Sequence, residues 1–150
     1  MTSTTHKSIV ILMADDDADD RLLAKDAFHE CQLDRGLEFV ENGEDLMDYL
    51  RHRGKYAARK DERLPGLILL DLNMPRKDGR EALQEIKGDP DFRRIPVVVF
   101  TTSRADTDIG RVYDLGANSF ITKPVAFDAL VSVMRALSLY WINTVELPHA

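Results

Sequence analysis

The chain has a single cysteine, Cys31, among 150 residues, so it cannot form an internal disulfide. A lone thiol is typical of a protein kept in a reducing compartment, where its ordinary role is to fill space in a core. No apolar stretch approaches the roughly 20 residues that a membrane-spanning helix requires. The short polar segment 1–7 does not resemble a signal peptide. These absences predict a cytoplasmic protein that does not enter a membrane.

Basic residues are in the minority, because 20 Lys and Arg face 26 Asp and Glu and leave a formal net charge of −6. Proteins that bind nucleic acid over a broad surface depend on clustered Lys and Arg, so we expect no direct DNA binding. Two nucleotide-binding motifs, G-x-x-x-x-G-K-[ST] and G-x-G-x-x-G, are also missing after the first apolar run. A nucleotide-binding α/β protein is therefore a poor alternative.

Short apolar runs are present at regular intervals, in a chain that is 44% hydrophobic and 31% charged and thus able to build one ordinary core. Runs without polar alternation indicate strands covered on both faces, as in a parallel sheet. Four runs are of this kind: 9–13, 67–70, 97–100 and 120–121. The segment 37–41 alternates more and is shorter, which favours an edge strand.

Between these runs, apolar residues recur with helical spacing. The stripes are Ala24, Ala27, Phe28 and Cys31; Leu46, Tyr49 and Leu50; Leu83 and Ile86; Ile109, Val112 and Tyr113; Phe127, Leu130, Val131 and Met134. Asp78 and Asp106 are candidate N-caps, and Gly116 is a candidate residue just past a helix end. Asp89-Pro90 should stop the third helix. The alternation of strand and helix, five times over, predicts an α/β domain with a doubly wound parallel sheet.

Two segments do not fit this alternation. Segment 51–63 (RHRGKYAARKDER) is a long charged connection, for which we expect a solvated surface loop, with a partner contact as the alternative. The last helix carries a second apolar stripe, followed by an apolar tail: Ala129, Val133, Ala136 and Tyr140, then Trp141, Ile142, Val145 and Leu147. Exposed apolar area of this extent usually marks an interface, which favours a homodimer. A tail folded over its own domain is the alternative.

Polar side chains follow four of the predicted strands. Counting 37–41 as the second strand, Asp15 and Asp16 follow the first strand, Asp71 the third, Thr101 the fourth and Lys123 the fifth. In a doubly wound sheet these positions share one edge, where functional groups gather. Each residue alone has an ordinary explanation as a turn or cap, but the ordered set does not. Neighbouring carboxylates repel unless a cation lies among them, and Mg²⁺ prefers such oxygen ligands, so Asp15, Asp16 and Asp71 predict a magnesium site.

A carboxylate beside a metal can attack phosphorus and form an aspartyl phosphate. Lys123 would then supply positive charge, and Thr101 a hydroxyl, to the phosphoryl oxygens. A haloacid-dehalogenase-like Mg²⁺ phosphatase is one alternative, but such enzymes usually carry a second Asp two residues after the nucleophile. The residue at that position here is Asn73.

Over residues 8–139 the chain resembles the receiver domains of two-component response regulators. Four motifs carry the resemblance: Asp15-Asp16, L-L-D-L-N-M-P-R-K-D-G at 69–79, T-T-S at 101–103 and F-I-T-K-P at 120–124. The resemblance implies the flavodoxin-like receiver fold, with five parallel strands in the order 2-1-3-4-5 and five helices. It also implies Mg²⁺-dependent phosphorylation by a histidine kinase in a phosphorelay, with no enzymatic activity beyond self-phosphorylation and self-dephosphorylation.

The resemblance assigns roles by position. Asp71 is implied as the phosphoacceptor, Asp16 as a direct metal ligand, Asp15 as a ligand through water, and Asn73 as a ligand through its backbone carbonyl. Thr101 and Phe120 match the switch hydroxyl and switch aromatic, and Lys123 matches the partner of the phosphate. Ser103 and Asn73 fall where side chains tune hydrolysis. The expected order of events is that Thr101 moves toward the phosphoryl group and Phe120 fills the space behind it.

Three further segments are similar to single-domain regulators paired with phytochrome-type kinases: Y-L-R-H-R-G-K-Y at 49–56, P-R-K-D-G at 75–79 and Y-W-I-N-T-V-E-L-P at 140–148. The implied partner is a sensor histidine kinase, with a bacteriophytochrome as one candidate. The expected organisation is a tail at 1–7, a receiver domain at 8–139 and a C-terminal extension at 140–150 that makes a dimer contact. A receiver-shaped interaction module that takes no phosphate remains as a further alternative.

Overall fold

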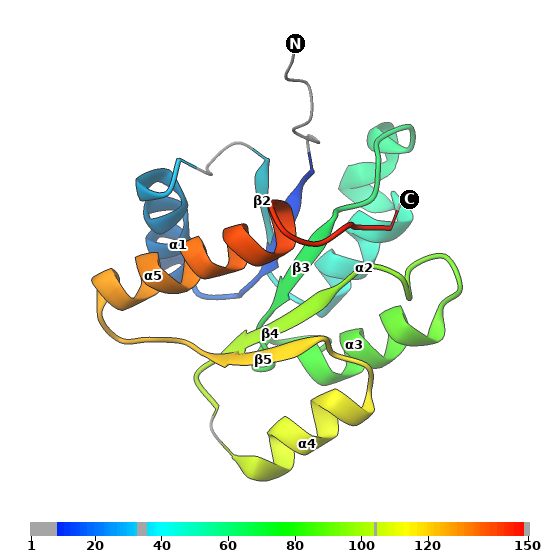
Figure 1. Cartoon of the computed structure of the whole chain (residues 1–150). Coiled ribbons are helices and arrows are strands. Elements are labelled where there is room, and N and C mark those ends of the chain that lie inside the picture. Colours follow the sequence, from blue (N-terminus) through cyan, green and yellow to red (C-terminus); the bar gives the residue numbers. More distant parts are fainter. Residues whose placement is uncertain (1–8, 33–35, 104, 149–150) are drawn as a thin grey trace.

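Strands and helices alternate along the chain, as predicted (Figure 1). A computed structural model describes residues 9–32, 36–103 and 105–148; the predicted tail at 1–7 and residues 149–150 of the extension lie outside them. The elements in order are β1 (Ile11–Ala14), α1 (Ala18–Glu30), β2 (Leu37–Val40), α2 (Gly43–Arg51), the 3₁₀ helix η1 (Gly54–Arg59), β3 (Leu67–Leu70), α3 (Gly79–Gly88), β4 (Val97–Thr101), α4 (Asp106–Asp114), β5 (Ser119–Thr122), α5 (Phe127–Leu137) and the π-helical turn η2 (Ser138–Ile142).

The five strands form one parallel sheet in the order β2-β1-β3-β4-β5, which confirms the predicted topology and places β2 at an edge. Ala14 at the end of β1 pairs with Leu70 at the end of β3, and Thr101 pairs with Thr122 at the ends of β4 and β5. The strands therefore end together, and the residues that follow them share the carboxyl edge of the sheet.

Both faces of the sheet are buried, which explains the apolar runs without polar alternation. Successive side chains of a strand point to opposite faces. In β1, Leu12 faces the core shared with α2, α3 and α4, whereas Met13 faces the core shared with α1 and α5. Figure 1 shows α1 and α5 packed together on one side of the sheet.

The predicted helix ends are mostly confirmed. Asp78 caps α3, and it forms a reciprocal capping box with Glu81. Asp89 is the C-cap of the same helix. Gly116 has a φ of +106° directly after the C-cap of α4, a conformation that favours glycine.

Two predictions for α4 are wrong. Asp106 is its first helical residue rather than its N-cap; that position falls on Ala105, and among the described residues no side chain caps this end. Tyr113 was grouped with Val112 on the buried stripe, yet it is 48% exposed while Val112 is fully buried. A single short face of α4 packs on the sheet, and Tyr113 lies just outside it.

Segment 51–63 is mostly exposed, as its charge predicts, but it is not a plain loop. It contains η1, and Tyr56 on this turn is buried. Arg59 stacks over the rings of Tyr49 and Tyr56, at 5.0 and 6.0 Å from their centroids, and its Nη2 lies 2.8 Å from Glu38 on β2. Burial raises the pKa of Tyr49 to about 12. The aromatic residue inside the charged stretch was the signal that the segment docks on the domain.

We expect Tyr56→Phe to destabilise the protein by about 1 kcal/mol, because the Tyr56 hydroxyl donates a hydrogen bond to Asp45 Oδ1 at 2.8 Å and the substitution removes this bond. Urea denaturation measures the loss. Tyr113→Phe is the matched control, since this ring is exposed and its hydroxyl makes no hydrogen bond within the described ranges. An equal loss of stability in the two variants would show that the hydrogen bond from Tyr56 to Asp45 does not stabilise the fold.

Part of the C-terminal extension is folded over its own domain, as in the alternative to a dimer contact. Trp141 and Ile142 pack against the core shared with α1 and α5, and Leu147 lies against Gly66. Leu139 and Tyr140 remain 63% and 53% exposed. Apolar side chains at the start of the extension therefore stay exposed while others are packed on the domain.

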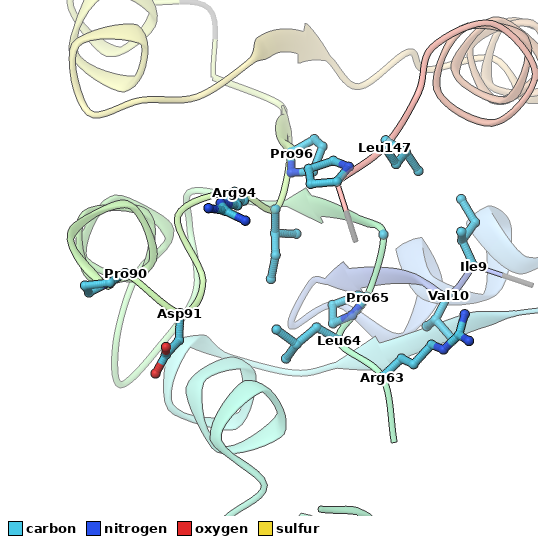
Figure 2. A pocket seen from close by; sticks show the side chains of 13 residues that line it. Ile9, Val10, Arg63, Leu64, Pro65, Pro90, Asp91, Arg94, Pro96 and Leu147 are labelled. Carbon is cyan, nitrogen blue, oxygen red and sulfur yellow. The ribbon is translucent and has the colours of Figure 1, made fainter. Parts of the chain in front are cut away.

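Leu147 also borders a cavity of about 580 Å³ at the amino ends of the strands, opposite the edge that carries Asp71 (Figure 2). Its lining is mainly apolar, with Ile9, Leu64 and Pro96 among the residues, and Arg63 and Arg94 also contribute to it. None of the helices built from the described residues combines the length and apolar composition needed to cross a bilayer.

Candidate functional site

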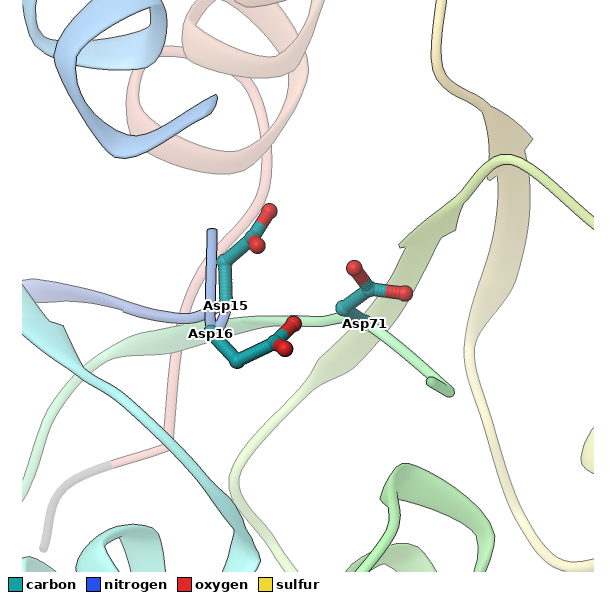
Figure 3. A group of neighbouring side chains, drawn as sticks. All are labelled: Asp15, Asp16 and Asp71. Atoms are coloured by element: carbon teal, nitrogen blue, oxygen red, sulfur yellow. The ribbon is translucent and has the colours of Figure 1, made fainter. Parts of the chain in front are cut away.

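Three predicted carboxylates meet at the carboxyl edge of the sheet (Figure 3). Asp15 follows β1 and Asp71 follows β3, and the Asp71 amide donates a hydrogen bond to Ala14 O at 3.0 Å. One oxygen from each of Asp15, Asp16 and Asp71 lies within 4.8 Å of the others. Asp15 and Asp71 are buried, whereas Asp16 is exposed. A set of hard oxygen donors at this spacing, open on one side, fits a divalent cation that keeps part of its water.

Lys123 extends from the end of β5 into the same group of acids. Its Nζ lies 2.5 Å from Asp15 Oδ2, 2.8 Å from Asp71 Oδ2 and 2.9 Å from Asp20 Oδ2. The side chain is only 9% exposed. Burial alone would lower the pKa of Lys123, but the hydrogen bonds to the three carboxylates outweigh it and raise the pKa above its ordinary value. Lys123 is therefore a fixed positive charge at the site.

Asp15 is the most deeply buried acid of the group. Burial raises its pKa, and the hydrogen bonds that it accepts from Lys123 and from the Asp17 amide offset only part of this effect. An acid in this environment gains from a cation, because the cation favours the charged form that burial penalises. The electrostatics of Asp15 thus agree with the metal-binding geometry.

Asp71 is held by donors on both of its oxygens. Thr101 Oγ1 donates to Oδ1 at 2.8 Å, the Asn73 amide donates to the same oxygen at 3.2 Å, and Lys123 bonds Oδ2. Thr101 is fully buried, and the partly buried Phe120 packs against the core shared with α2, α3 and α4. Thr101 therefore contacts the carboxylate of Asp71 directly.

The loop after Asp71 returns on itself. The Gly79 amide donates to Leu72 O at 2.9 Å, so the first turn of α3 begins directly beside the strand end. A Cβ at Gly79 would lie 2.2 Å from Asp71 O, which leaves space for glycine alone. This close approach fixes the backbone that presents Asp71.

Comparison with known proteins identifies the fold family. The model of the response regulator receiver domain matches residues 11–135. The chain belongs to this family. Over the whole length of both chains, this receiver domain is 37% identical to response regulator Rcp1 of Synechocystis sp.. It is 36% identical over 135 residues to the probable methanogenesis regulatory protein FilR2 of Methanothrix harundinacea, covering 89% of this chain and 84% of that protein.

Solved structures of similar receiver proteins share the same architecture. The phosphorylated cyanobacterial phytochrome response regulator RcpA has a TM-score of 0.86 and 39% identity, covering 95% of this chain and 99% of that one. The Mn²⁺-bound form of Rcp1 has a TM-score of 0.83 and 38% identity, covering 93% and 99%. Response regulator RPA3017, from red light signalling of R. palustris, has a TM-score of 0.88 and 34% identity, covering 95% and 99%.

Two features of the receiver site were not predicted. Asp20, in the first turn of α1, is a third carboxylate on Lys123. Its only sequence signal was a second Asp pair soon after the first. Ser103, predicted from the resemblance to tune hydrolysis, donates its hydroxyl to Asp108 Oδ2 at 2.7 Å, and Arg80 Nη2 binds Asp108 Oδ1 at 2.8 Å. The bonds from Ser103 and then Arg80 lower the pKa of Asp108 and tie the β4–α4 loop to α3.

Proposed function

We propose that this response regulator works by accepting a phosphoryl group on Asp71 from a sensor histidine kinase. The observation that carries the proposal is the set of contacts around one carboxylate. Asp71 lies against two further acids at metal-binding spacing, and it is bonded by the Thr101 hydroxyl and the Lys123 ammonium. Phosphoryl transfer requires such positioning together with charge neutralisation, and little other chemistry from the protein.

We assign the metal as Mg²⁺, held by Asp16 and Asp71 directly, by Asp15 through water and by the backbone carbonyl of Asn73. When bound, the ion would neutralise the negative charge of these carboxylates and of the phosphoryl oxygens during transfer. The oxygen-only donor set supports this assignment, since it suits a hard cation. The Mn²⁺-bound form of Rcp1 gives further support.

The residues of the chain supply the remaining steps. An oxygen of Asp71 attacks the phosphorus of a phosphohistidine, the P–N bond breaks as the O–P bond forms, and the imidazole nitrogen retains the electron pair. Lys123, already 2.8 Å from Asp71 Oδ2, is placed to bind an oxygen of the arriving group. The Thr101 hydroxyl exchanges its bond with Asp71 for one with a phosphoryl oxygen. Phe120 contributes packing alone, because it has no hydroxyl.

Phosphorylation with a small donor tests the function. Incubation with acetyl phosphate and Mg²⁺ should add one hydroxylamine-sensitive phosphoryl group per chain, detected by intact-protein mass spectrometry, and chelation of the metal should prevent it. A phosphatase would instead release phosphate over many turnovers, while an interaction module that works without phosphate would remain unlabelled. The proposal expects only self-phosphorylation and self-dephosphorylation.

We expect Mg²⁺ to raise the thermal unfolding midpoint of the wild-type protein, because a ligand that binds only the folded state stabilises it, by about 2.7 kcal/mol at 100 times its dissociation constant. Asp16→Asn should reduce this shift, since it replaces one of the three clustered carboxylates with a neutral amide. Differential scanning calorimetry with and without Mg²⁺ measures both shifts. Asp91→Asn, at the opposite edge of the sheet, is the control that should keep the full shift.

For partners, we propose a cytoplasmic sensor kinase of the bacteriophytochrome type. The support is the similarity to RcpA, which is described as a cyanobacterial phytochrome response regulator, and to the bacteriophytochrome response regulator AtBRR, at 37% identity. Phosphotransfer from candidate histidine kinases of the same cell tests it, and the fastest transfer should come from a phytochrome-type kinase. We propose no direct DNA contact, because the net charge is −6.

We also propose a homodimer, formed by the last helix and the extension at 140–150, outside a receiver domain that spans 8–139 and follows a short tail at 1–7. The exposure of Leu139 and Tyr140 in η2, directly after α5, supports it, because apolar side chains clustered in this way favour a partner surface. Sedimentation of the chain cut after Leu139 should give the mass of a monomer where the full chain gives a dimer. An unchanged mass would refute this arrangement.

A further inference from the structure

Asp20 contacts Lys123 of the proposed transfer site, yet the proposed function gives Asp20 no role. It lies in the first turn of α1, and its Oδ2 accepts a hydrogen bond from Lys123 Nζ at 2.9 Å. Its side chain is 35% exposed, whereas Asp15 and Asp71, the other two acids on Lys123, are 0% and 9% exposed. Asp20 is therefore the most solvent-exposed of the three acids that bind the ammonium.

The three N–H donors of the Lys123 ammonium each bond a different carboxylate: Asp15, Asp20 or Asp71. Two of these acceptors belong to the proposed chemistry. Asp71 is the proposed phosphoacceptor, and Asp15 is a proposed metal ligand. Asp20 is the one acceptor of the three that neither the metal nor the phosphoryl group would use. A lysine side chain has four rotatable bonds, so a contact outside the reacting atoms is what can hold its charge in place.

We propose that Asp20 is a positioning residue for phosphoryl transfer, which anchors the Lys123 ammonium on the α1 side so that the donor now bonded to Asp71 faces the phosphoryl group arriving there. The inference rests on the proposed function of Asp71 and Lys123. It places the start of α1 within the transfer site, since the anchor is carried by the helix that follows the metal-binding acids.

Two effects of removing the Asp20 charge can be told apart, because they change the rate of phosphoryl transfer in opposite directions. Removing a negative charge near the site should attract an anionic donor more strongly and speed transfer, whichever residue loses the charge. Loss of an anchor should slow transfer, and only at Asp20. Asp19 is the matched position: it is the neighbouring residue in the same helical turn, it is exposed, and its carboxylate makes no hydrogen bond or ion pair within the described part of the chain.

The experiment compares wild type, Asp20→Asn, Asp20→Glu and Asp19→Asn, with acetyl phosphate as the donor. Mn²⁺ affinity is measured first by electron paramagnetic resonance, so that each variant is phosphorylated at saturating metal. Thermal unfolding midpoints report any structural effect. We expect Asp20→Asn to slow phosphorylation by about 3- to 10-fold through loss of positioning. Asp19→Asn should stay within about 2-fold of wild type or be faster, and Asp20→Glu should recover most of the lost rate, because its carboxylate can still reach Lys123.

The outcomes separate the inference from the function on which it rests. If the wild-type protein is not phosphorylated by acetyl phosphate, the proposed function itself is wrong. A labelled wild type with equal rates for Asp20→Asn and Asp19→Asn overturns only the role of Asp20, and so does a faster Asp20→Asn. If Asp20→Glu is as slow as Asp20→Asn, contact with the ammonium is not the cause, and the inference also fails.

Discussion

Asp71→Asn should abolish phosphoryl uptake from acetyl phosphate altogether while the protein remains folded. The amide has nearly the shape of the carboxylate, so the oxygen that accepts from Thr101 and from the Asn73 amide can stay in place. It lacks the negative oxygen that attacks phosphorus, and an amide nitrogen would face Lys123 where Oδ2 now accepts a 2.8 Å bond. The substitution therefore removes the nucleophile and one of three acceptors of the ammonium.

Intact-protein mass spectrometry after incubation with donor and Mg²⁺ measures the uptake, and circular dichroism checks the fold. Asp91→Asn is the matched control, because it removes the same charge from an exposed residue at the amino edge of the sheet. It should be labelled like wild type. A phosphoryl group that persists in Asp71→Asn would place the acceptor elsewhere and remove the basis for the proposed mechanism.

Gly79→Ala adds a single methyl group beside the site, and we expect it to destabilise the protein strongly. The added Cβ would lie 2.2 Å from Asp71 O, 2.7 Å from Leu72 Cα and 2.9 Å from Asp71 C. All three atoms belong to backbone, so no change of rotamer relieves the overlap, and the β3–α3 loop must move. We expect a loss of about 3 kcal/mol or more in the free energy of unfolding, a large part of the stability of an ordinary domain. Phosphorylation should fall with it, because the same loop presents Asp71.

Gly110→Ala makes the same chemical change in α4, where a Cβ would meet nothing within 4 Å among the described residues. Since alanine has the higher helix propensity, this variant should gain about 0.5–1 kcal/mol. Urea denaturation of both variants gives the two values. The predicted effects have opposite signs, so a Gly79→Ala protein as stable as wild type would show that the close approach to Asp71 is not a constraint.

The sequence predicted the alternation of strands and helices because both signals are local. A strand buried on both faces must be apolar throughout, and a helix on a sheet must repeat its apolar residues every three or four positions. The strand order, by contrast, came from the family resemblance and not from the pattern. The meeting of Asp15, Asp71, Thr101 and Lys123 was predictable because parallel strands end at a common edge.

Contacts that depend on packing between distant segments were not predicted. Tyr56 lies in a segment whose charge indicates a loop. The structure shows why η1 packs on the domain: Arg59 contacts the Tyr56 ring and forms an ion pair with Glu38 on β2. Tyr113 shares the spacing of a buried stripe, but it is 48% exposed, beside the fully buried Val112. Sequence periodicity shows that a helix has an apolar face. It does not show how much of the helix surface is buried by the elements packed against it.

The sequence by itself determined the fold class, the family and the residues at the strand ends, since these follow from apolar patterning and from motifs that are contiguous in the chain. Only the tertiary structure decided that Lys123 bonds Asp20 as well as the two acids of the site, that Thr101 already contacts Asp71, and that Ser103 is tied to Asp108. The physical reason is that hydrogen bonds form over about 3 Å between side chains whose positions are set by the packing of separate helices and loops.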